Sequence, residues 1–250
     1  MAFNSIAFTM DNHFIKFIGL LSCIALLFPS CTGTNKQNNQ LTEDEKKQGW
    51  VLLFDGRSMN GWHLYNRGKV PTVWIVKNEE LYCDPESKSE QGDLTSDQEF
   101  ENFDLKFDWK IEKMGNSGVF INVLERPDLS TTWASGPEYQ LLEKSHPDYP
   151  DSTKRSGCLY GFGATKNPVE EKPFGEWNQS RIKQVNGKIE FYLNDVLTVQ
   201  QDLTSPNWLD MISKSGFKNF PEFGRHTRGH IALQEWAKGI SFRNIKIKQL

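Results

Sequence analysis

The chain has 250 residues and the composition of a folded protein, with 37% hydrophobic, 12% aromatic and 24% charged residues. Its 29 basic and 32 acidic side chains give a formal net charge of -3, which argues against a polybasic surface for nucleic acid or lipid. The sequence contains eight tryptophans, all at or after Trp50. So many amphipathic rings indicate either a β-sandwich core or a surface on which sugars stack.

The N-terminal segment is the most apolar part of the chain and predicts export. A hydrophobic run over residues 14–28 ends just before Cys31, where the sequence turns polar. The run is short for a transmembrane span, which needs about 20 residues, and it resembles a bacterial lipoprotein signal. We therefore expect residues 1–30 to be a signal peptide, Cys31 to be lipidated, and residues 31–47 to form a flexible tether. A plain secretory signal and a single membrane anchor are the alternatives, and the periplasmic or surface side of the outer membrane stays open.

Alternating apolar and polar residues predict β-strands in the rest of the chain. In Phe103–Ile111 every odd position is apolar and every even position charged, so one face should be buried. Residues 181–193 are typical of a hairpin through Asn186-Gly187, which suits the positive φ angles of a two-residue turn. A second turn at Asn194-Asp195 extends the hairpin into a meander, and a parity change near Arg243-Asn244 predicts a bulge.

One helix is predicted, over residues 206–215, because Ser205 can cap it, Pro206 suits its first position and Gly216 can end it. One helix does not build an α/β fold, and many short strands joined by Gly, Pro and Asn turns favour an all-β sandwich of two antiparallel sheets. We expect one domain over residues 48–250. Its further strands are expected at Trp50–Phe54, Val73–Val76, Glu80–Cys83, Val119–Leu124, Glu138–Glu143, Cys158–Phe162 and Ile231–Gln234.

Two questions stay open at this level. Cys83 and Cys158 are the cysteines of the predicted domain, and their positions are as compatible with a disulfide as with two free thiols. No cluster of metal ligands can be recognised in the sequence, so the cofactor requirement is unknown.

A series of motifs resembles, in order, that of one known family. The motifs are Val51–Trp62, Asn116–Phe120, Gly136–Glu143, Gly157–Tyr160, Gly175–Asn178, Gly229–Gln234 and Ser241–Ile245. The chain is identified as a member of the 3-keto-disaccharide hydrolase family, domain of unknown function 1080, over nearly all of residues 50–250. The resemblance implies an exported concanavalin A-like jelly-roll sandwich that cleaves glycosides with a ketone at C3. The chain departs from the family at Asn122, where Arg is common, and at Glu235-Trp236, where Asp-His is common.

The predicted strand Glu138–Glu143 carries the principal catalytic candidate. Alternation places Glu138 and Gln140 on one face and Tyr139 on the other. Partial burial would raise the pKa of Glu138 toward neutrality and allow it to act as a general base or acid; a hydrogen-bonded structural carboxylate is the alternative. Glu143 has the opposite parity and is expected to be structural.

The remaining candidates come from loops and other strands. His146, in the loop after this strand, is the candidate acid, although a solvated loop histidine is the alternative. The residues expected to hold the substrate are Asn116, Gln140, Trp177, Asn178 and Gln234. Trp177 would stack on a sugar, with a core position as its alternative. Gln234 and Glu235 have opposite parity, so only one is expected to face the cleft, and the resemblance favours Gln234.

These residues lead to an expected reaction. The sequence lacks a nucleophile elbow, a phosphate loop, a dinucleotide fingerprint and a zinc-protease motif. A C3 ketone acidifies the hydrogen at C2, so one base can start elimination of the C1 substituent, and water can then add to the enone. We expect hydrolysis of 3-keto-disaccharides in this way, with a carbohydrate as the partner, no nucleic acid, and membrane contact only through the lipid anchor. A noncatalytic carbohydrate-binding sandwich and an ordinary O-glycoside hydrolase are the alternatives.

Overall fold

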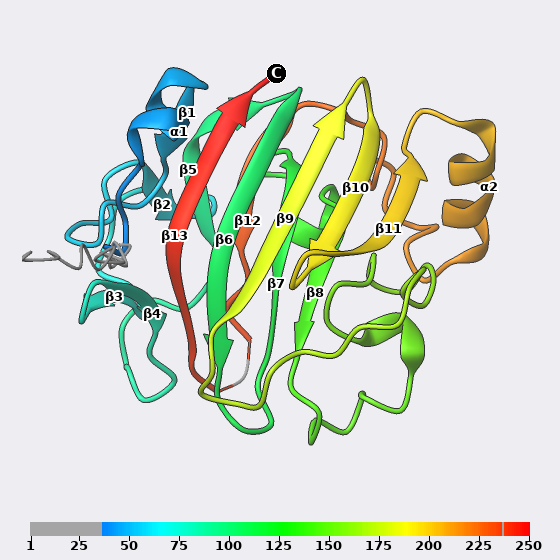
Figure 1. Cartoon of the computed structure of the whole chain (residues 1–250). Helices are drawn as coiled ribbons and strands as arrows, with labels where there is room; N and C mark the ends of the chain where they lie inside the picture. Colours follow the sequence, from blue (N-terminus) through cyan, green and yellow to red (C-terminus); the bar gives the residue numbers. More distant parts are fainter. Residues whose placement is uncertain (1–36, 237) are drawn as a thin grey trace, which may run out of the picture. The chain divides into compact units, whose positions relative to one another are not determined.

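The computed structural model describes residues 37–236 and 238–250, which form two antiparallel β-sheets packed face to face (Figure 1). The larger sheet contains β1 (Trp50–Leu52), β3 (Trp74–Lys77), β4 (Glu80–Cys83), β6 (Phe103–Ile111), β9 (Asn178–Val185), β10 (Lys188–Leu193), β11 (Val196–Asp202) and β13 (Ile240–Gln249). The smaller sheet contains β2 (Trp62–Leu64), β5 (Leu94–Phe100), β7 (Asn116–Val123), β8 (Glu138–Leu142) and β12 (Gly229–Leu233). The predicted all-β sandwich is confirmed.

The order of the strands shows which parts of the chain become neighbours. The larger sheet runs β11-β10-β9-β6-β13-β4-β3, and β1 also pairs with β13. The smaller sheet runs β2-β5-β12-β7-β8. The late strands β12 and β13 therefore lie inside the two sheets, and the residues that follow β12 lie among elements from the first half of the chain.

Aromatic side chains from both sheets fill the core between them. Tyr139 of β8 lies between Phe107 of β6 and Phe191 of β10, with ring centroids 5.8 and 5.1 Å away. Its hydroxyl lies 2.7 Å from the Ser180 hydroxyl of β9. Tyr139 belongs to the smaller sheet and its three partners to the larger one, so this residue joins the two layers. The opposite face of β8 is thereby directed away from the core.

The alternation of β6 is confirmed, with one difference. All the odd positions of Phe103–Ile111 are buried, as predicted. Asp104 and Asp108 are buried as well, because basic and amide side chains cover them. Asp104 accepts two hydrogen bonds from Arg181, at 2.7 and 2.6 Å, and Asp108 accepts one from the Asn244 amide at 2.7 Å. A buried carboxylate needs such partners to offset the loss of its hydration.

The predicted turns and the bulge are also confirmed. The β9–β10 turn has φ angles of 50° at Asn186 and 73° at Gly187, and a Cβ on Gly187 would lie 2.6 Å from Thr204. Asn194 and Asp195 form the second turn, with φ angles of 46° and 66°. The register of β13 against β6 shifts between Arg243 and Lys246, where Asn244 has a φ of 53°.

Some elements differ from the prediction. The predicted helix is α2 (Pro206–Lys214), capped by Ser205 as expected, but its C-cap is Ser215 rather than Gly216. The segment 158–162 is not a strand and makes only an isolated bridge between Leu159 and Tyr139. The sequence did not predict β2 or β5: β2 is short, and the consecutive polar residues of β5 interrupt its alternation. Two short 3-10 helices, η1 (Thr132–Ala134) and η2 (Ser152–Lys154), are also present.

Part of the segment that was expected to be a tether, residues 31–47, makes ordered contacts with the sandwich. Helix α1 (Glu43–Lys47) lies in the segment assigned to the tether, and Thr42 begins it with a capping box that includes Glu45. The buried Asn39 exchanges hydrogen bonds with Asn244, at 2.6 and 2.8 Å. Residues 37–47 are therefore part of the folded domain, whereas the predicted signal peptide and Cys31 lie outside the described residues.

The two domain cysteines are buried free thiols. Cys83 lies in β4 of the larger sheet, and Cys158 lies in the loop after β8, with its Sγ 3.2 Å from the Ser152 carbonyl oxygen. Burial raises the pKa of both thiols, to about 11 for Cys158. Of the two alternatives that the sequence left open, free thiols are the correct one.

Candidate active site

An open cleft with a volume of about 390 Å³ lies at the edge of the smaller sheet where β2 and β12 end and β5 begins. One wall is the turn after β2, at residues 65–67, and another is the segment 127–133 after β7. The chain that precedes β5 and the chain that follows β12 contribute the remaining residues, among them Asp93, Gln234, Glu235 and Trp236. The lining side chains thus come from four distant parts of the sequence.

Asp93 is the residue that links these segments. Its Oδ1 accepts a hydrogen bond from the backbone N–H of Glu235 at 2.9 Å, and its Oδ2 accepts one from the hydroxyl of Thr132. Burial raises the pKa of the Asp93 carboxyl to about 6, and the neighbouring Glu235 adds to the shift. Near neutral pH this carboxyl can therefore exist in both protonation states. Asp93 is not predicted from the sequence, because it lies just before β5, a strand that the alternation of apolar and polar residues does not reveal.

Glu138, the first residue of β8, lies on the face of the smaller sheet that is turned away from the core, close enough to Asp93 for the two carboxyls to repel each other. It is not among the residues that line the cleft. Its side chain crosses Gly118 of β7, where a Cβ would stand 2.0 Å from Glu138 Oε1. Only 8% of Glu138 is exposed. Burial, followed by repulsion from Asp93, raises the pKa of Glu138 well above its ordinary value. Among the described residues, none donates a hydrogen bond to this carboxyl, which leaves its oxygens free for a substrate.

Gln234 and Glu235 both line the cleft. The expectation that only one could face it is wrong, because β12 ends at Leu233 and strand alternation no longer applies. The Oε1 atom of Gln234 is buried without a hydrogen-bond partner among the described residues. Burial raises the pKa of Glu235. The cleft therefore offers an unused amide acceptor and carboxyl groups that hold their protons more tightly than carboxyls in water.

Tyr160 is a further neighbour of Glu138 that the sequence analysis did not select. After β8 the chain loops out and returns alongside the strand, so that the Tyr160 N–H donates to the Glu138 carbonyl oxygen at 3.1 Å. Burial raises the pKa of the Tyr160 hydroxyl; Lys154 opposes the shift and the charge of Glu138 adds to it. The Nζ atom of Lys154 lies 5.9 Å from the centre of the Tyr160 ring.

The structure brings Asn116 and Gln140 together on the same sheet. The amide nitrogen of Gln140 lies 3.3 Å from Asn116 Oδ1. His146 lies at the other end of β8 from Glu138, and its Nδ1 accepts a hydrogen bond from the Asp148 N–H at 3.1 Å. The strand between them spans about 13 Å, so the structure does not place His146 beside Glu138 and no longer favours it as the acid.

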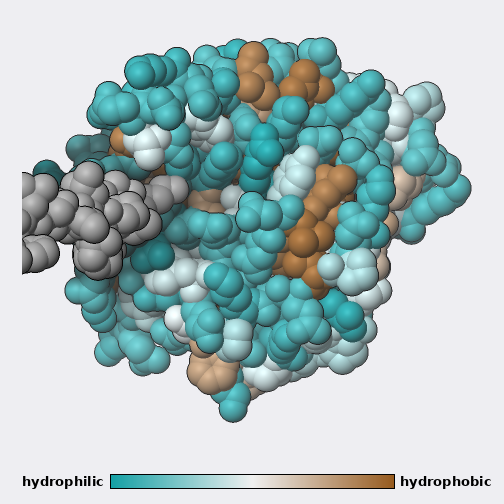
Figure 2. All heavy atoms as spheres, viewed as in Figure 1, coloured by the Kyte–Doolittle hydropathy of each residue, from teal (hydrophilic) through white to brown (hydrophobic). Residues whose placement is uncertain are grey.

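Trp177 and Asn178 lie on the larger sheet and not beside Glu138. The Trp177 ring is covered by Arg243, whose Cζ is 3.9 Å from the ring centre, and by Lys110 at 4.7 Å. Asn178 is buried, and its Oδ1 accepts hydrogen bonds from the Lys172 N–H and the Asn194 amide, which fits a structural role. The outer face of this sheet is mainly hydrophilic (Figure 2).

Five of the tryptophans are core residues, and two others line the cleft. The core residues are Trp50, Trp62, Trp74, Trp109 and Trp208. Trp133 and Trp236 line the cleft from different segments, and 63% of Trp236 is exposed.

Asn122, the other departure from the family pattern, is buried and donates to Gln184 Oε1 at 2.7 Å, so it links the two sheets. No group of three or more potential metal-ligating side chains occurs within residues 37–236 and 238–250.

Comparisons with known proteins extend these observations. The family described as the 3-keto-alpha-glucoside-1,2-lyase-like domain matches residues 49–248. A 3-keto-disaccharide hydrolase of Bacteroides thetaiotaomicron is 31% identical over 229 residues, which cover 81% of this chain and 79% of that protein.

Solved structures agree with this match. A protein of Parabacteroides distasonis ATCC 8503, provisionally described as a glycosyl hydrolase, superposes with a TM-score of 0.78 at 31% identity, over 86% of this chain and all (100%) of that one. A second protein of the same organism and description has a TM-score of 0.61 at 25% identity, over 80% of this chain and 99% of that one. The sandwich, its cleft of carboxyl groups and these relatives define a carbohydrate hydrolase. Within that class, the chain belongs to the family of 3-keto-alpha-glucoside-1,2-lyase-like domains.

Proposed function

We propose that the protein cleaves glycosides whose sugar carries a ketone at C3, by elimination followed by hydration. The observation that carries the proposal is the carboxyl of Glu138, which is buried beside Asp93 and has no hydrogen-bond partner among the described residues. A carboxyl kept in this state has a raised pKa and is a stronger base once it has lost its proton. The names of the matching family and of the Bacteroides relative support the 3-keto substrate.

In the proposed reaction, Glu138 removes the proton from C2 of the sugar. The electrons of the C–H bond form an enolate with the C3 ketone. When the enolate collapses, the C1–O bond breaks and the leaving oxygen takes a proton. Water then adds its oxygen to C1 and a proton returns to C2, so that the overall change is hydrolysis. One base and one proton donor suffice for both the elimination and the hydration.

Asp93 is the group that we propose as the proton donor to the leaving oxygen. Its pKa of about 6 keeps a fraction of the carboxyl protonated near neutral pH, as general acid catalysis requires. Thr132 and the Glu235 N–H hold its oxygens in place. Tyr160, whose N–H is bonded to the Glu138 carbonyl oxygen, is the second candidate for this role.

Substrate binding is assigned to the unused polar atoms and the aromatic rings of the cleft. The Gln234 Oε1 atom can accept a hydrogen bond from a sugar hydroxyl, and Trp133 and Trp236 can pack against the faces of sugar rings. Asn116 and Gln140 continue the row of amides on the same sheet. Trp177 and Asn178 take no part in this proposal, because they lie on the other sheet.

The mechanism is tested by the hydrogen at C2. The protein is incubated with 4-nitrophenyl 3-keto-α-glucoside in deuterated water, and the released sugar is analysed by mass spectrometry and NMR. We expect one deuterium at C2 and none with the Glu138→Gln variant. The released sugar incubated alone with the protein gives the background exchange. A product without deuterium at C2 beyond that background would rule out elimination.

The same assay separates the alternatives. Cleavage of 4-nitrophenyl α-glucoside, which has no ketone, at a comparable rate would indicate an ordinary glycoside hydrolase. Quenching of tryptophan fluorescence by the keto-sugar without product formation would indicate a binding module. We expect turnover only of the oxidised substrate.

We further propose that the protein is exported and held to a membrane by a lipid on Cys31. Within residues 37–236 and 238–250, none of the helices has the length and hydrophobicity needed to cross a membrane. The proposal rests on the sequence of residues 14–31. Metabolic labelling with a fatty acid tests it: label is expected on the full-length protein and not on the Cys31→Ser variant. Equal labelling of the two would contradict it.

A further inference from the structure

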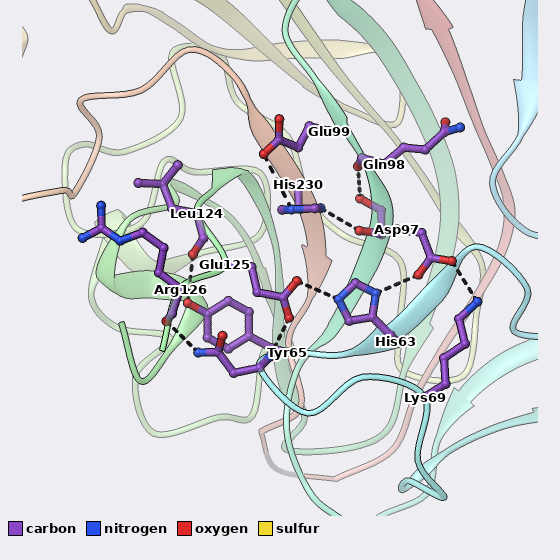
Figure 3. Close-up of polar contacts among 12 residues, drawn as sticks. His63, Tyr65, Lys69, Asp97, Gln98, Glu99, Leu124, Glu125, Arg126 and His230 are labelled. Carbon is purple, nitrogen blue, oxygen red and sulfur yellow. Dashed lines mark hydrogen bonds and ion pairs between the residues drawn. The ribbon is translucent and has the colours of Figure 1, made fainter. Parts of the chain in front are cut away.

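His63, the central residue of β2, lies between two carboxylates (Figure 3). Its Nδ1 is 2.7 Å from Asp97 Oδ1, and its Nε2 is 2.8 Å from Glu125 Oε2. A neutral imidazole can donate from only one nitrogen, whereas an ionised carboxylate only accepts. Both contacts are therefore hydrogen bonds only if His63 carries two protons, as an imidazolium. The His63 side chain is 13% exposed, so this charge is largely shielded from water.

The neighbouring charges favour the imidazolium. Burial acts to lower the pKa of His63, but the hydrogen bonds with Asp97 and Glu125 outweigh burial and raise it. Four other charged or titratable groups surround this contact. Lys69 lies 3.0 Å from Asp97, and the ring centre of His230 lies 6.3 Å from that of His63. Glu99 lies 3.8 Å from His230, and Arg228 lies 2.9 Å from Glu99. Lys69 and Arg228 are each paired with a carboxylate, and His230 directs its Nδ1 to the Ser96 carbonyl oxygen at 2.7 Å.

Glu125 connects His63 to both walls of the cleft. Its second oxygen, Oε1, accepts a hydrogen bond from the Asn66 N–H at 2.6 Å. The Asn66 amide in turn donates to the Leu129 carbonyl oxygen at 2.7 Å and to that of Arg126 at 3.0 Å. Tyr65 donates its hydroxyl proton to the Leu129 carbonyl oxygen at 2.9 Å. The turn at residues 65–67 and the segment 127–133 are the two walls of the cleft, and this network joins them.

We propose that His63 is a positioning residue for the cleft: as an imidazolium it fixes Glu125, which ties the 65–67 wall to the 127–133 wall. When His63 loses one proton, one of its ring nitrogens faces a carboxylate oxygen with no proton between them, and that hydrogen bond is lost. Among the described residues, only His63 donates to Glu125 Oε2, so a neutral His63 with its proton on Nδ1 leaves this oxygen without a donor. In either neutral tautomer the attraction between the imidazolium charge and Glu125 is lost, and the tie between the walls is weakened. The binding of sugar then depends on pH through a residue that does not touch the sugar.

The direction of this dependence follows from the contacts. A histidine that gains partners in the folded state holds its second proton to a higher pH than in the unfolded chain. The stabilisation is complete below the ordinary histidine pKa of about 6.5. It is lost as the pH rises through the higher value of the folded protein. The cleft is therefore expected to bind substrate best in neutral to mildly acidic solution.

The structural part of the proposal is tested on the wild-type protein without substrate. NMR follows the ring nitrogens of His63 and the backbone amide of Asn66 between about pH 5.5 and 9. We expect both to titrate with one midpoint, above about 6.5, because the Asn66 N–H reports on the position of Glu125. A His63 midpoint at or below the ordinary value, or an Asn66 amide that does not follow it, would overturn the proposal. This readout does not depend on the proposed reaction.

The functional part rests on the proposed function and uses 4-nitrophenyl 3-keto-α-glucoside. KM of the wild type is expected to rise about tenfold through the same midpoint while the pH profile of kcat shows no step there. His63→Gln is expected to have the higher KM at every pH. His226→Gln is the control, because His226 makes a similar contact, 2.8 Å from Glu222, but the side-chain partners of Glu222 are His226 and Arg126 and not the turn at residues 65–67. A His63→Gln variant with the KM and pH profile of the wild type would contradict the proposal.

Discussion

Gly118 and Glu138 lie on adjacent strands so closely that the Cβ of any other residue at position 118 would stand 2.0 Å from Glu138 Oε1. The backbone of Gly118 does not need glycine for its φ angle, because it is not among the residues with a positive φ. The glycine is needed for the space that it leaves. That space is occupied by the carboxyl that we propose as the catalytic base.

Replacing Gly118 with alanine is therefore expected to impair catalysis more than folding. The methyl group displaces the Glu138 carboxyl by about 1 Å, a misplacement that can reduce kcat about 100-fold, while the overpacking costs about 1–3 kcal/mol of stability. Steady-state kinetics and thermal unfolding measure the two effects. Gly163→Ala is the control, since a Cβ at that position would meet no atom within 4 Å beyond its chain neighbours. A Gly118→Ala enzyme with the kcat of the wild type would show that the position of Glu138 does not matter.

Glu138→Gln at the start of β8 and Glu143→Gln just after its end make the same substitution and should have opposite effects. Glu138→Gln is expected to lower kcat by about 100- to 10,000-fold and not to lower stability near neutral pH, because it removes an unpaired buried carboxyl. Glu143→Gln should leave kcat unchanged and cost about 1–3 kcal/mol. The Glu143 carboxylate accepts hydrogen bonds from the Met114 N–H at 2.7 Å and the Ser145 N–H at 3.1 Å. Steady-state kinetics and denaturant unfolding of both variants measure the two effects. An equal loss of activity in both would contradict the assignment of Glu138 as the catalytic base.

Asp93 predicts a pH dependence of stability. Its pKa is about 6 in the folded protein and 3.8 ordinarily, so between these values the folded state binds more protons than the unfolded state. The contribution of Asp93 to the free energy of unfolding therefore falls by about 1–3 kcal/mol as the pH rises from about 4 to about 6. Asp93→Asn should remove this fall, and its stability relative to the wild type should be greater at pH 8 than at pH 4. Unfolding measured at both pH values tests this, and a constant difference would contradict it.

The two exposed faces can be distinguished by their tryptophans. Trp236→Ala is expected to raise KM about 3- to 10-fold, since an aromatic contact contributes about 0.5–1.5 kcal/mol beyond the area it buries. Trp177→Ala should leave KM unchanged, because cations cover its ring on the larger sheet. Titration of each variant with the keto-sugar, followed by kinetics, makes the comparison. A larger effect of Trp177→Ala would move the binding site to the other sheet.

Local patterns were sufficient to predict much of the fold. The alternation of residues 103–111 and the positive φ angles allowed by Asn186-Gly187 act between neighbours in the sequence, and both are confirmed. Where alternation is interrupted, prediction failed: the polar Asp97-Gln98-Glu99 lie in the middle of β5. Missing β5 also concealed Asp93, whose importance comes from burial next to distant segments such as that of Thr132, 39 residues away.

The site was only partly predictable because proximity in the sequence differs from proximity in the sandwich. His146 follows Glu138 closely in the chain, but the loop carries it away, and Tyr160 is the residue that returns to lie beside Glu138. The sequence predicts a stacking role for Trp177 and gives Trp236 only as a departure from the family pattern, because nothing in the sequence states on which sheet a residue lies. The face on which Glu138 lies was predictable, since the alternate residue Tyr139 is a core aromatic.

The pairing of the first strand of the larger sheet with the last has a practical consequence for fusion proteins. Trp50 at the start of β1 faces Lys248 near the end of β13, so the first strand and the C-terminus lie side by side at the same end of the larger sheet (Figure 1). The cleft is formed by segments of the smaller sheet. A protein joined after Leu250 would therefore emerge beside β1. Because Asn39 is hydrogen-bonded to Asn244, a linker from residue 250 back to residue 37 has to span only the last residues of β13, about 20 Å, and should permit circular permutation without rebuilding the cleft.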